Sequence, residues 1–162
     1  MAEKRYWLFK SEPNAYSFTD LMNEPDGWAE WDGVRNYQAR NSMRDDMKVG
    51  DGILFYHSNA QPLSIVGIAS IVREGYDDFH GLDPNDDHYD PKATQENPIW
   101  SMVDIKADHT MAHPVTLDEI KDNPKLKDML LIRKGMRLSI QPVTKEEFDE
   151  VVSMGGGPAS LS

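Results

Sequence analysis

The chain has 162 residues, no cysteine and a formal net charge of −11. The lack of cysteine excludes disulfides, thiol nucleophiles and thiolate-held zinc or iron–sulfur sites. The negative charge disfavours a long nonspecific contact with nucleic acid unless the Lys and Arg side chains gather on one face. The length favours one domain, at residues 1–154, followed by a flexible Gly-rich tail at residues 155–162.

The N-terminal part of the chain predicts a buried strand and then a short helix. Residues 6–9 read Tyr-Trp-Leu-Phe, a compact apolar run that is typical of a buried strand. Pro13 cannot continue a central strand, so the polar residues 10–12 are expected at the exit of the strand, where binding groups often lie. A solvated turn is the simpler explanation of this trio. Residues 17–22 predict a capped short helix.

Residues 36–47 predict an amphipathic helix, because apolar side chains recur there every four positions. Arg40 and Arg44 share that spacing on an adjacent face and could meet a phosphate, although such a row is more often only a solvated face. Arg35 and Asn36 fall at the N-terminus of this helix, where free backbone N–H groups favour an anion or a hydrogen-bonding ligand.

Two further strands are predicted at residues 53–58 and 64–72, both as neighbours of the first strand in a barrel-like sheet. The near-continuous apolar start of the earlier one implies burial on both of its faces. Gly67 interrupts the later one and indicates a bulge or a close backbone approach.

Residues 75–98 are acidic and rich in turn formers, which predicts a long surface loop. Asp83, Asn85 and Asp87 fit the first ligand positions of a calcium-binding loop, but His88 stands where that loop requires Gly. We therefore expect no metal and no other cofactor. A looser cation site stays open, built from His80, Asp86, His88 or Asp90.

The C-terminal half predicts, in chain order, a strand at 98–105, helices at 116–120 and 124–134, a strand at 137–142 and a helix at 144–152 that begins with a Thr-x-x-Glu capping box. Trp100 could belong to the core or form a second stacking surface, and we favour the core. His109 and His113 are four residues apart, but Thr110 replaces the Glu of a zinc-protease motif, so the pair is not interpreted as a metal site.

The sequence contains none of the phosphate-loop, dinucleotide-binding or nucleophile-elbow motifs, which weighs against the common enzyme classes. An acid/base pair of Glu12 and His57 is conceivable, but the sequence does not test whether they meet. No apolar run approaches membrane-spanning length, so we expect a soluble, cytoplasmic protein without a membrane partner.

Residues 31–59 combine polar groups that could read a small planar ligand with aromatic side chains that could cover its faces. The polar groups are Arg35, Asn36, Asn41, His57, Ser58 and Asn59, and the aromatic side chains are Trp31, Tyr37 and Tyr56. Stacking of an aromatic ring on a nucleobase contributes about 1–3 kcal/mol. Each residue also has a structural explanation, since Asn36 could cap a helix and Trp31 could belong to the core.

The sequence resembles the EVE domain family through several blocks in order. These blocks are residues 7–13, 31–41, 55–59, 67–69 and 97–100, together with Val103 and Asp104. The resemblance covers most of residues 5–152. It implies an α+β, PUA-like pseudo-barrel of mixed strands flanked by short helices.

The resemblance also implies a function, which is to hold a modified base, such as a methylated or hydroxymethylated cytosine of DNA or RNA, without catalysis. By position, the implied pocket residues are Ser11, Glu12, Trp31, Arg35, Asn36, Ser58 and Asn59, with Lys10, Arg40 and Arg44 as phosphate contacts. Two alternatives stay open: an enzyme acting on a nucleotide or nucleoside, and a module that binds a small molecule or a protein.

Overall fold

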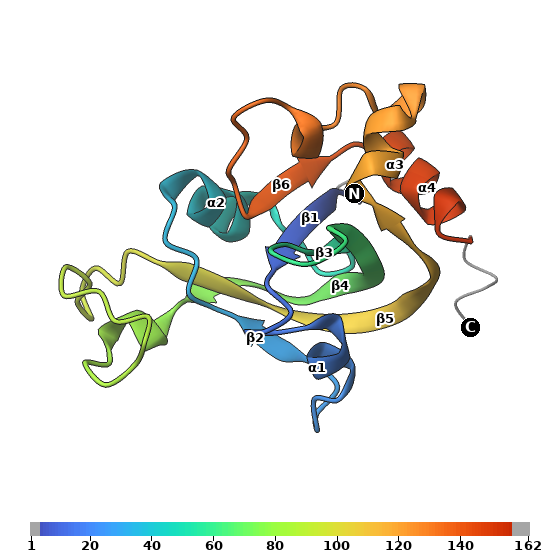
Figure 1. The fold of residues 1–162 in the computed structure, drawn as a ribbon. Helices are drawn as coiled ribbons and strands as arrows, with labels where there is room; N and C mark the ends of the chain where they lie inside the picture. The colour runs from blue at the N-terminus through green and yellow to red at the C-terminus, as the bar shows by residue number, and fades with distance from the viewer. Residues whose placement is uncertain (1–3, 157–162) are drawn as a thin grey trace.

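The computed structural model describes residues 4–156, which form a six-stranded mixed sheet flanked by short helices (Figure 1). The strands are β1 (Tyr6–Ser11), β2 (Ala29–Trp31), β3 (Gly52–His57), β4 (Ser64–Asp77), β5 (Ser101–Thr116) and β6 (Ile140–Val143). They lie in the order β2-β5-β4-β3-β1-β6; β1 pairs with β3 in parallel, and the other neighbouring pairs are antiparallel. The long strands β4 and β5 curve strongly, which confirms the expected α+β pseudo-barrel.

The helices lie around this sheet and are short. They are α1 (Phe18–Met22), α2 (Tyr37–Asn41), α3 (Leu117–Asp122) and α4 (Lys145–Met154), with a π turn η1 (Ser42–Asp46) that continues α2 and the 3-10 turns η2 (Phe79–Leu82), η3 (Pro124–Leu126) and η4 (Leu130–Ile132). Ser17, Thr116 and Thr144 each begin a helix with a capping box, in which their side chain accepts the N–H of the third helical residue. No helix within residues 4–156 is long and apolar enough to cross a membrane.

The parallel pair of strands β1 and β3 buries side chains on both faces of the sheet, as their apolar runs predict. Trp7 and Phe9 of β1 belong to one core cluster, and Leu8 between them belongs to the other. Since successive side chains of a strand point to opposite faces, the continuous apolar run places core material on each side of the sheet.

Gly67 lies where the β3–β4 and β4–β5 registers shift, and it lets α1 approach the sheet. A Cβ atom at this position would lie 2.3 Å from Cζ of Phe18, which is closer than any side chain could tolerate. The expected close approach at this glycine is therefore confirmed.

Two predictions in the C-terminal half are wrong. Residues 124–134 form only the turns η3 and η4, because Met129 between them is extended (ψ 132°) and its side chain is buried in the core. The strand expected to end at 105 continues as β5 to Thr116, through Pro114. A shift of register opposite Val66 leaves Pro114 without a partner on β4, so its missing N–H breaks no ladder bond.

The expected flexible tail is described only at its start. Gly155 is buried, and its carbonyl accepts the backbone N–H of His113 at 3.1 Å. Residues 157–162 of that prediction lie outside the described residues.

Candidate functional site

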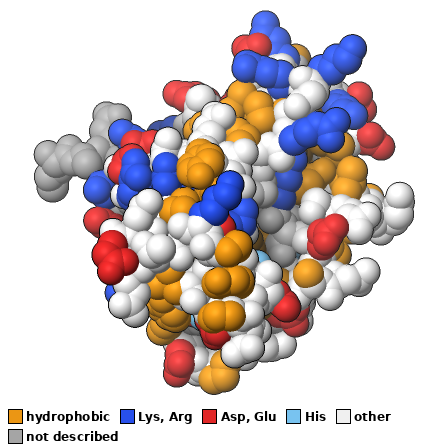
Figure 2. Space-filling view, turned by 90° about the vertical axis from the view of Figure 1, so that its left-hand side faces the viewer, with side chains coloured by type: hydrophobic (Ala, Val, Ile, Leu, Met, Phe, Trp, Pro, Cys, Tyr) orange, Lys and Arg blue, Asp and Glu red, His pale blue; other side chains and the backbone are white. Residues whose placement is uncertain are grey.

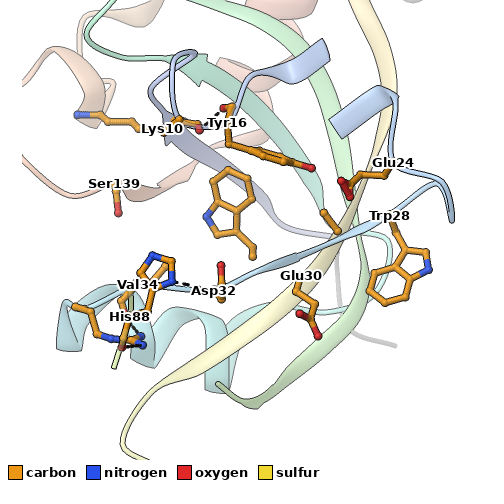
Figure 3. Close-up of a pocket in the computed structure, with 15 residues that line it drawn as sticks. Lys10, Tyr16, Glu24, Trp28, Glu30, Asp32, Val34, His88 and Ser139 are labelled. Carbon is orange, nitrogen blue, oxygen red and sulfur yellow. Dashed lines mark hydrogen bonds and ion pairs between the residues drawn. The ribbon is translucent and has the colours of Figure 1, made fainter. Parts of the chain in front are cut away.

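A cavity of about 720 Å³ opens where the end of β1, the segment around β2 and the long acidic loop meet (Figure 3). Its lining residues are Lys10, Ser11, Ala15, Tyr16, Glu24, Trp28, Ala29, Glu30, Trp31, Asp32, Gly33, Val34, Arg35, His88 and Ser139. Lys10 and Ser139 lie on one side of it, and Glu24 and Trp28 lie on the opposite side. This volume falls within the range of ordinary small-ligand pockets.

Trp31 is both a core residue and a wall of the cavity. Its ring packs against Phe9 at 5.4 Å and edge-on against Phe55 at 5.6 Å and Tyr16 at 6.1 Å, measured between centroids. These contacts hold the indole in one orientation while the ring still lines the cavity. No described residue accepts a hydrogen bond from its Nε1–H, so that donor is available to a ligand.

The wall formed by Gly33, Arg35 and His88 is fixed by the buried carboxylate of Asp78. Asp78 Oδ2 accepts the backbone N–H of Gly33 at 2.9 Å and Arg35 Nη1 at 3.0 Å. Arg35 Nη2 donates to the carbonyl of His88 at 2.6 Å, which ties the acidic loop to the same point. Gly33 (φ +76°) is required here, because a Cβ would lie 2.5 Å from Nε2 of His88.

The polar groups of the cavity are in partly desolvated surroundings. Burial raises the pKa of the Asp32 carboxyl, and the charge of Asp78 adds to this effect while that of His88 opposes it. Burial lowers the pKa of the Lys10 ammonium. The Tyr16 hydroxyl is buried without a hydrogen-bond partner among the described residues and points towards Glu24; burial and that carboxylate raise its pKa. The cavity thus offers both donors and acceptors.

Two histidines link the acidic side chains beside the cavity. His80 Nε2 lies 3.0 Å from Glu30 and its Nδ1 lies 3.1 Å from Asp86, while His88 Nδ1 lies 3.5 Å from both Asp32 and Asp86. The bond to Glu30 raises the pKa of His80, against an opposing effect of burial. Within the described part of the chain no group of His and carboxylate side chains has the arrangement of a metal site.

Four of the residues predicted for the site line this cavity: Lys10, Ser11, Trp31 and Arg35. The roles of two of them differ from those expected. The guanidinium of Arg35 is engaged by Asp78 and His88 and shapes the wall, and the Ser11 hydroxyl donates to the carbonyl of Tyr16.

The structure does not bring Glu12, Asn36, Ser58 and Asn59 to the cavity. The Asn36 side chain accepts the N–H of Ala39 and caps α2, which is the structural explanation raised by its sequence position. Ser58 follows β3 and lies beside the end of β1, with its N–H bonded to the carbonyl of Ser11, but Asn59 (φ +49°) then turns the chain back towards β4. The carbonyl of Glu12 accepts the N–H groups of the turn that leads to Tyr16.

Neither Arg40 nor Arg44 lines the cavity, and both have partners. Arg40 Nη1 donates to the carbonyl of Ile99 at 2.7 Å, and Arg44 makes two hydrogen bonds of 2.9 Å to the neighbouring Asp45. Their contact with phosphate stays a prediction. The conceivable Glu12–His57 pair is not formed, since Nε2 of His57 accepts the N–H of Phe18 at 3.1 Å.

Sequence reasoning missed seven cavity residues that carry a polar or aromatic side chain: Tyr16, Glu24, Trp28, Glu30, Asp32, His88 and Ser139. Asp32 lies within residues 31–59 and Trp28 three residues before that stretch, so their closeness to Trp31 in the sequence is the signal that could have identified them. Nothing local points to Ser139 or His88, because only the fold brings them to β1 and β2.

Comparison with known proteins gives consistent matches along nearly the whole chain. A family model described as "EVE domain" matches residues 5–154. "Thymocyte nuclear protein 1" from Rattus norvegicus is 43% identical over 166 residues, which cover 92% of this chain and 73% of that protein.

Two solved structures illustrate the similarity in three dimensions. A hypothetical protein from Leishmania major has a TM-score of 0.88 and 44% identity, covering 95% of this chain and 96% of that one. Human THYN1 protein, in complex with 5-methylcytosine containing DNA, has a TM-score of 0.87 and 41% identity, covering 94% of this chain and 98% of that one.

Proposed function

The chain belongs to the EVE domain family, and from this premise we propose that it is a non-enzymatic domain that holds one modified base of DNA, such as 5-methylcytosine, in the cavity beside Trp31. The similarity to human THYN1 protein, whose structure contains 5-methylcytosine DNA, supports this ligand class. A base enters such a cavity only after it leaves the duplex stack, which costs a few kcal/mol.

The single observation that supports the proposal most is the position of Trp31. Its indole is held in one orientation by Phe9 and Phe55 and lines the cavity, so it presents a fixed aromatic surface to a ligand. A nucleobase stacked on it would gain about 1–3 kcal/mol, which offsets much of the cost of unstacking.

The polar groups of the cavity match the hydrogen-bonding edge of cytosine, which carries both a donor and acceptors. The exocyclic amine of cytosine donates hydrogen bonds, and the carboxyl of Asp32 lies at the cavity as an acceptor for it. The Nε1–H of Trp31 has no acceptor among the described residues and suits a ring or carbonyl acceptor of the base. Val34 and Ala29 offer apolar surface to a methyl group.

Binding without turnover is supported by how His57 is used. A general base needs a free ring nitrogen, but Nε2 of His57 accepts the N–H of Phe18, and burial lowers the pKa of this imidazole. The hypothesis of an enzyme on a free nucleotide has no corresponding observation in its favour.

Binding to short oligonucleotides, each with one modified base, tests the proposal. DNA and RNA, single- and double-stranded, are compared with unmodified controls at one stated salt concentration. We expect a preference for one modified DNA base. The absence of a preference for any modified base would overturn the proposal. A preference confined to RNA would mean that the partner is RNA instead of DNA.

Two cavity variants and one control sharpen this test. Trp31→Ala should weaken binding to the modified oligonucleotide by about 5- to 150-fold, the equivalent of the stacking free energy. Because Trp31 also packs in the core, Asp32→Asn provides a second variant of unchanged volume, which should lower the preference for the modified base. Phe79→Ala removes an aromatic ring that is 49% exposed and outside the lining, so it should leave binding unchanged.

A further inference from the structure

A segment without acidic residues runs from Met129 to Thr144 in an otherwise strongly acidic chain. It carries three cations, Arg133, Lys134 and Arg137, and the side chains of all three are exposed. We call residues 133–137 the basic loop. Figure 2 shows Lys and Arg side chains gathered along the upper part of one face of the molecule, despite the excess of acids overall.

The basic loop differs from most other cationic positions because its charges are free. Arg5, Arg44 and Lys48 each lie within 4 Å of a carboxylate. By contrast, no described residue forms an ion pair or a side-chain hydrogen bond with Arg133, Lys134 or Arg137. Three unpaired like charges so close together repel one another, and a bound anion would relieve that repulsion.

The loop is held at both ends, so its cations project from a fixed base. Leu131 before it packs in the core, and the carbonyl of Leu138 after it accepts the side-chain amide of the buried Gln141 at 2.9 Å. Between these anchors the N–H of Met136 bonds to the carbonyl of Arg133 at 3.1 Å, and Gly135 (φ +79°) supplies the left-handed residue of that turn. Binding of an anion would therefore cost little backbone entropy, because the loop is already held in place.

The basic loop leads directly into the cavity wall. Ser139 lines the cavity, and its carbonyl accepts the N–H of Lys10 at 2.8 Å. Arg137 is two residues earlier, so the two Cα atoms are at most about 7 Å apart. Lys10 and Ser139 lie on the side of the cavity opposite the acidic Glu24, so the basic loop adjoins the side that carries the ammonium of Lys10.

We propose that the basic loop binds the phosphates that flank the base held in the cavity, through Arg133, Lys134 and Arg137. This inference rests on the proposed function, since it assigns the backbone contacts of the same ligand. Phosphate contacts fix the register of a protein on DNA and supply most of its salt-dependent affinity, without carrying sequence information. The contacts would thus present any base to Trp31, and the cavity would select among them.

The experiment compares two triple variants of equal charge. One carries Arg133→Gln, Lys134→Gln and Arg137→Gln, and the other, its control, carries Lys121→Gln, Lys125→Gln and Lys127→Gln at exposed positions outside the cavity lining. Affinity for a 5-methylcytosine oligonucleotide and its unmodified counterpart is measured from about 50 to 200 mM salt.

We expect the loop variant to weaken binding to both oligonucleotides by the same factor and to reduce the slope of log affinity against log salt by about 2–3, or 0.7–0.9 for each lost contact. The control variant should keep the slope of the unmodified protein. A third variant, Arg133→Lys with Arg137→Lys, keeps both charges and should also keep the slope.

The two proposals fail in different ways. An unchanged slope in the loop variant, or an equal loss in the control variant, would overturn the assignment of the basic loop even where the preference for 5-methylcytosine persists. A reduced slope without any preference for the modified base would support phosphate binding by the basic loop and overturn the proposal that the cavity recognises a modified base.

Discussion

Replacement of Asp78 by Ala should destabilise the protein and disable the cavity together. The carboxylate is fully buried and accepts three donors: Gly33 N–H and Arg35 Nη1 from the segment after β2, and His80 N–H from its own segment. Removing it leaves the guanidinium of Arg35 without its counter-ion and two backbone donors without acceptors.

The size of the effect follows from these partners. Breaking a buried ion pair from one side costs about 3–5 kcal/mol, and the lower end applies here because the Arg35 side chain is 25% exposed and water can screen it. Each orphaned N–H adds about 1–3 kcal/mol unless water replaces the lost oxygen. We therefore expect a loss of about 3–5 kcal/mol, which for a domain of this size lowers Tm by roughly 6–20 °C.

Urea and thermal unfolding of Asp78→Ala and Asp78→Asn measure this loss, and oligonucleotide binding is followed below the transition. The Asn variant keeps one acceptor oxygen and should lose less stability. Asp45→Ala is the control, since Asp45 pairs with Arg44 at the surface, and its removal should not shift the transition. A Tm of Asp78→Ala equal to that of the unmodified protein would refute the assignment of Asp78 as the anchor of the cavity wall.

Three further changes test other parts of the structure. Asp51→Ala should cost about 3 kcal/mol in urea unfolding, because its buried carboxylate accepts three N–H groups, among them Trp7 Nε1 at 3.0 Å; an unchanged midpoint would contradict this. Gly67→Ala should lower the free energy of unfolding by about 1–3 kcal/mol through overpacking, seen as a lower Tm, and Phe18→Leu in the same chain should restore part of the loss. His80 has a raised pKa in the folded state, mainly through its bond to Glu30, so its contribution is complete below the unfolded pKa of about 6.5 and is lost as the pH rises through the folded value. The free energy of unfolding should fall over that window, and His80→Gln should abolish the step.

Local sequence patterns predicted much of the sheet and few of the cavity residues. The strands at 6–9 and 53–58 were recognisable because burial on both faces demands an unbroken apolar run, and the helix at 144–152 because its capping box is a short-range feature. Residues 124–134 misled the prediction, since burial of Met129 in the core overrides their helical pattern.

The cavity escaped prediction because it depends on convergence of distant segments. The polar ends of β1 and β3 do lie side by side, as their parallel pairing requires, yet Ser58 and Asn59 enter a turn instead of the lining. His88 is tied to the cavity wall by Arg35, and Ser139 by Lys10, and no periodicity in the sequence encodes those contacts.

The position of β1 between β3 and β6 has a consequence for synthesis of the chain. Among the six described strands, β1 is synthesised first and pairs on one side with β6, which is synthesised last, since Tyr6 faces Val143 and Phe9 faces Ile140. At about 5–20 residues per second, roughly 7–27 s separate the two. During that interval one edge of β1 has no partner, and such an edge invites pairing with another chain. Chaperone capture of nascent chains should therefore end abruptly once β6 emerges.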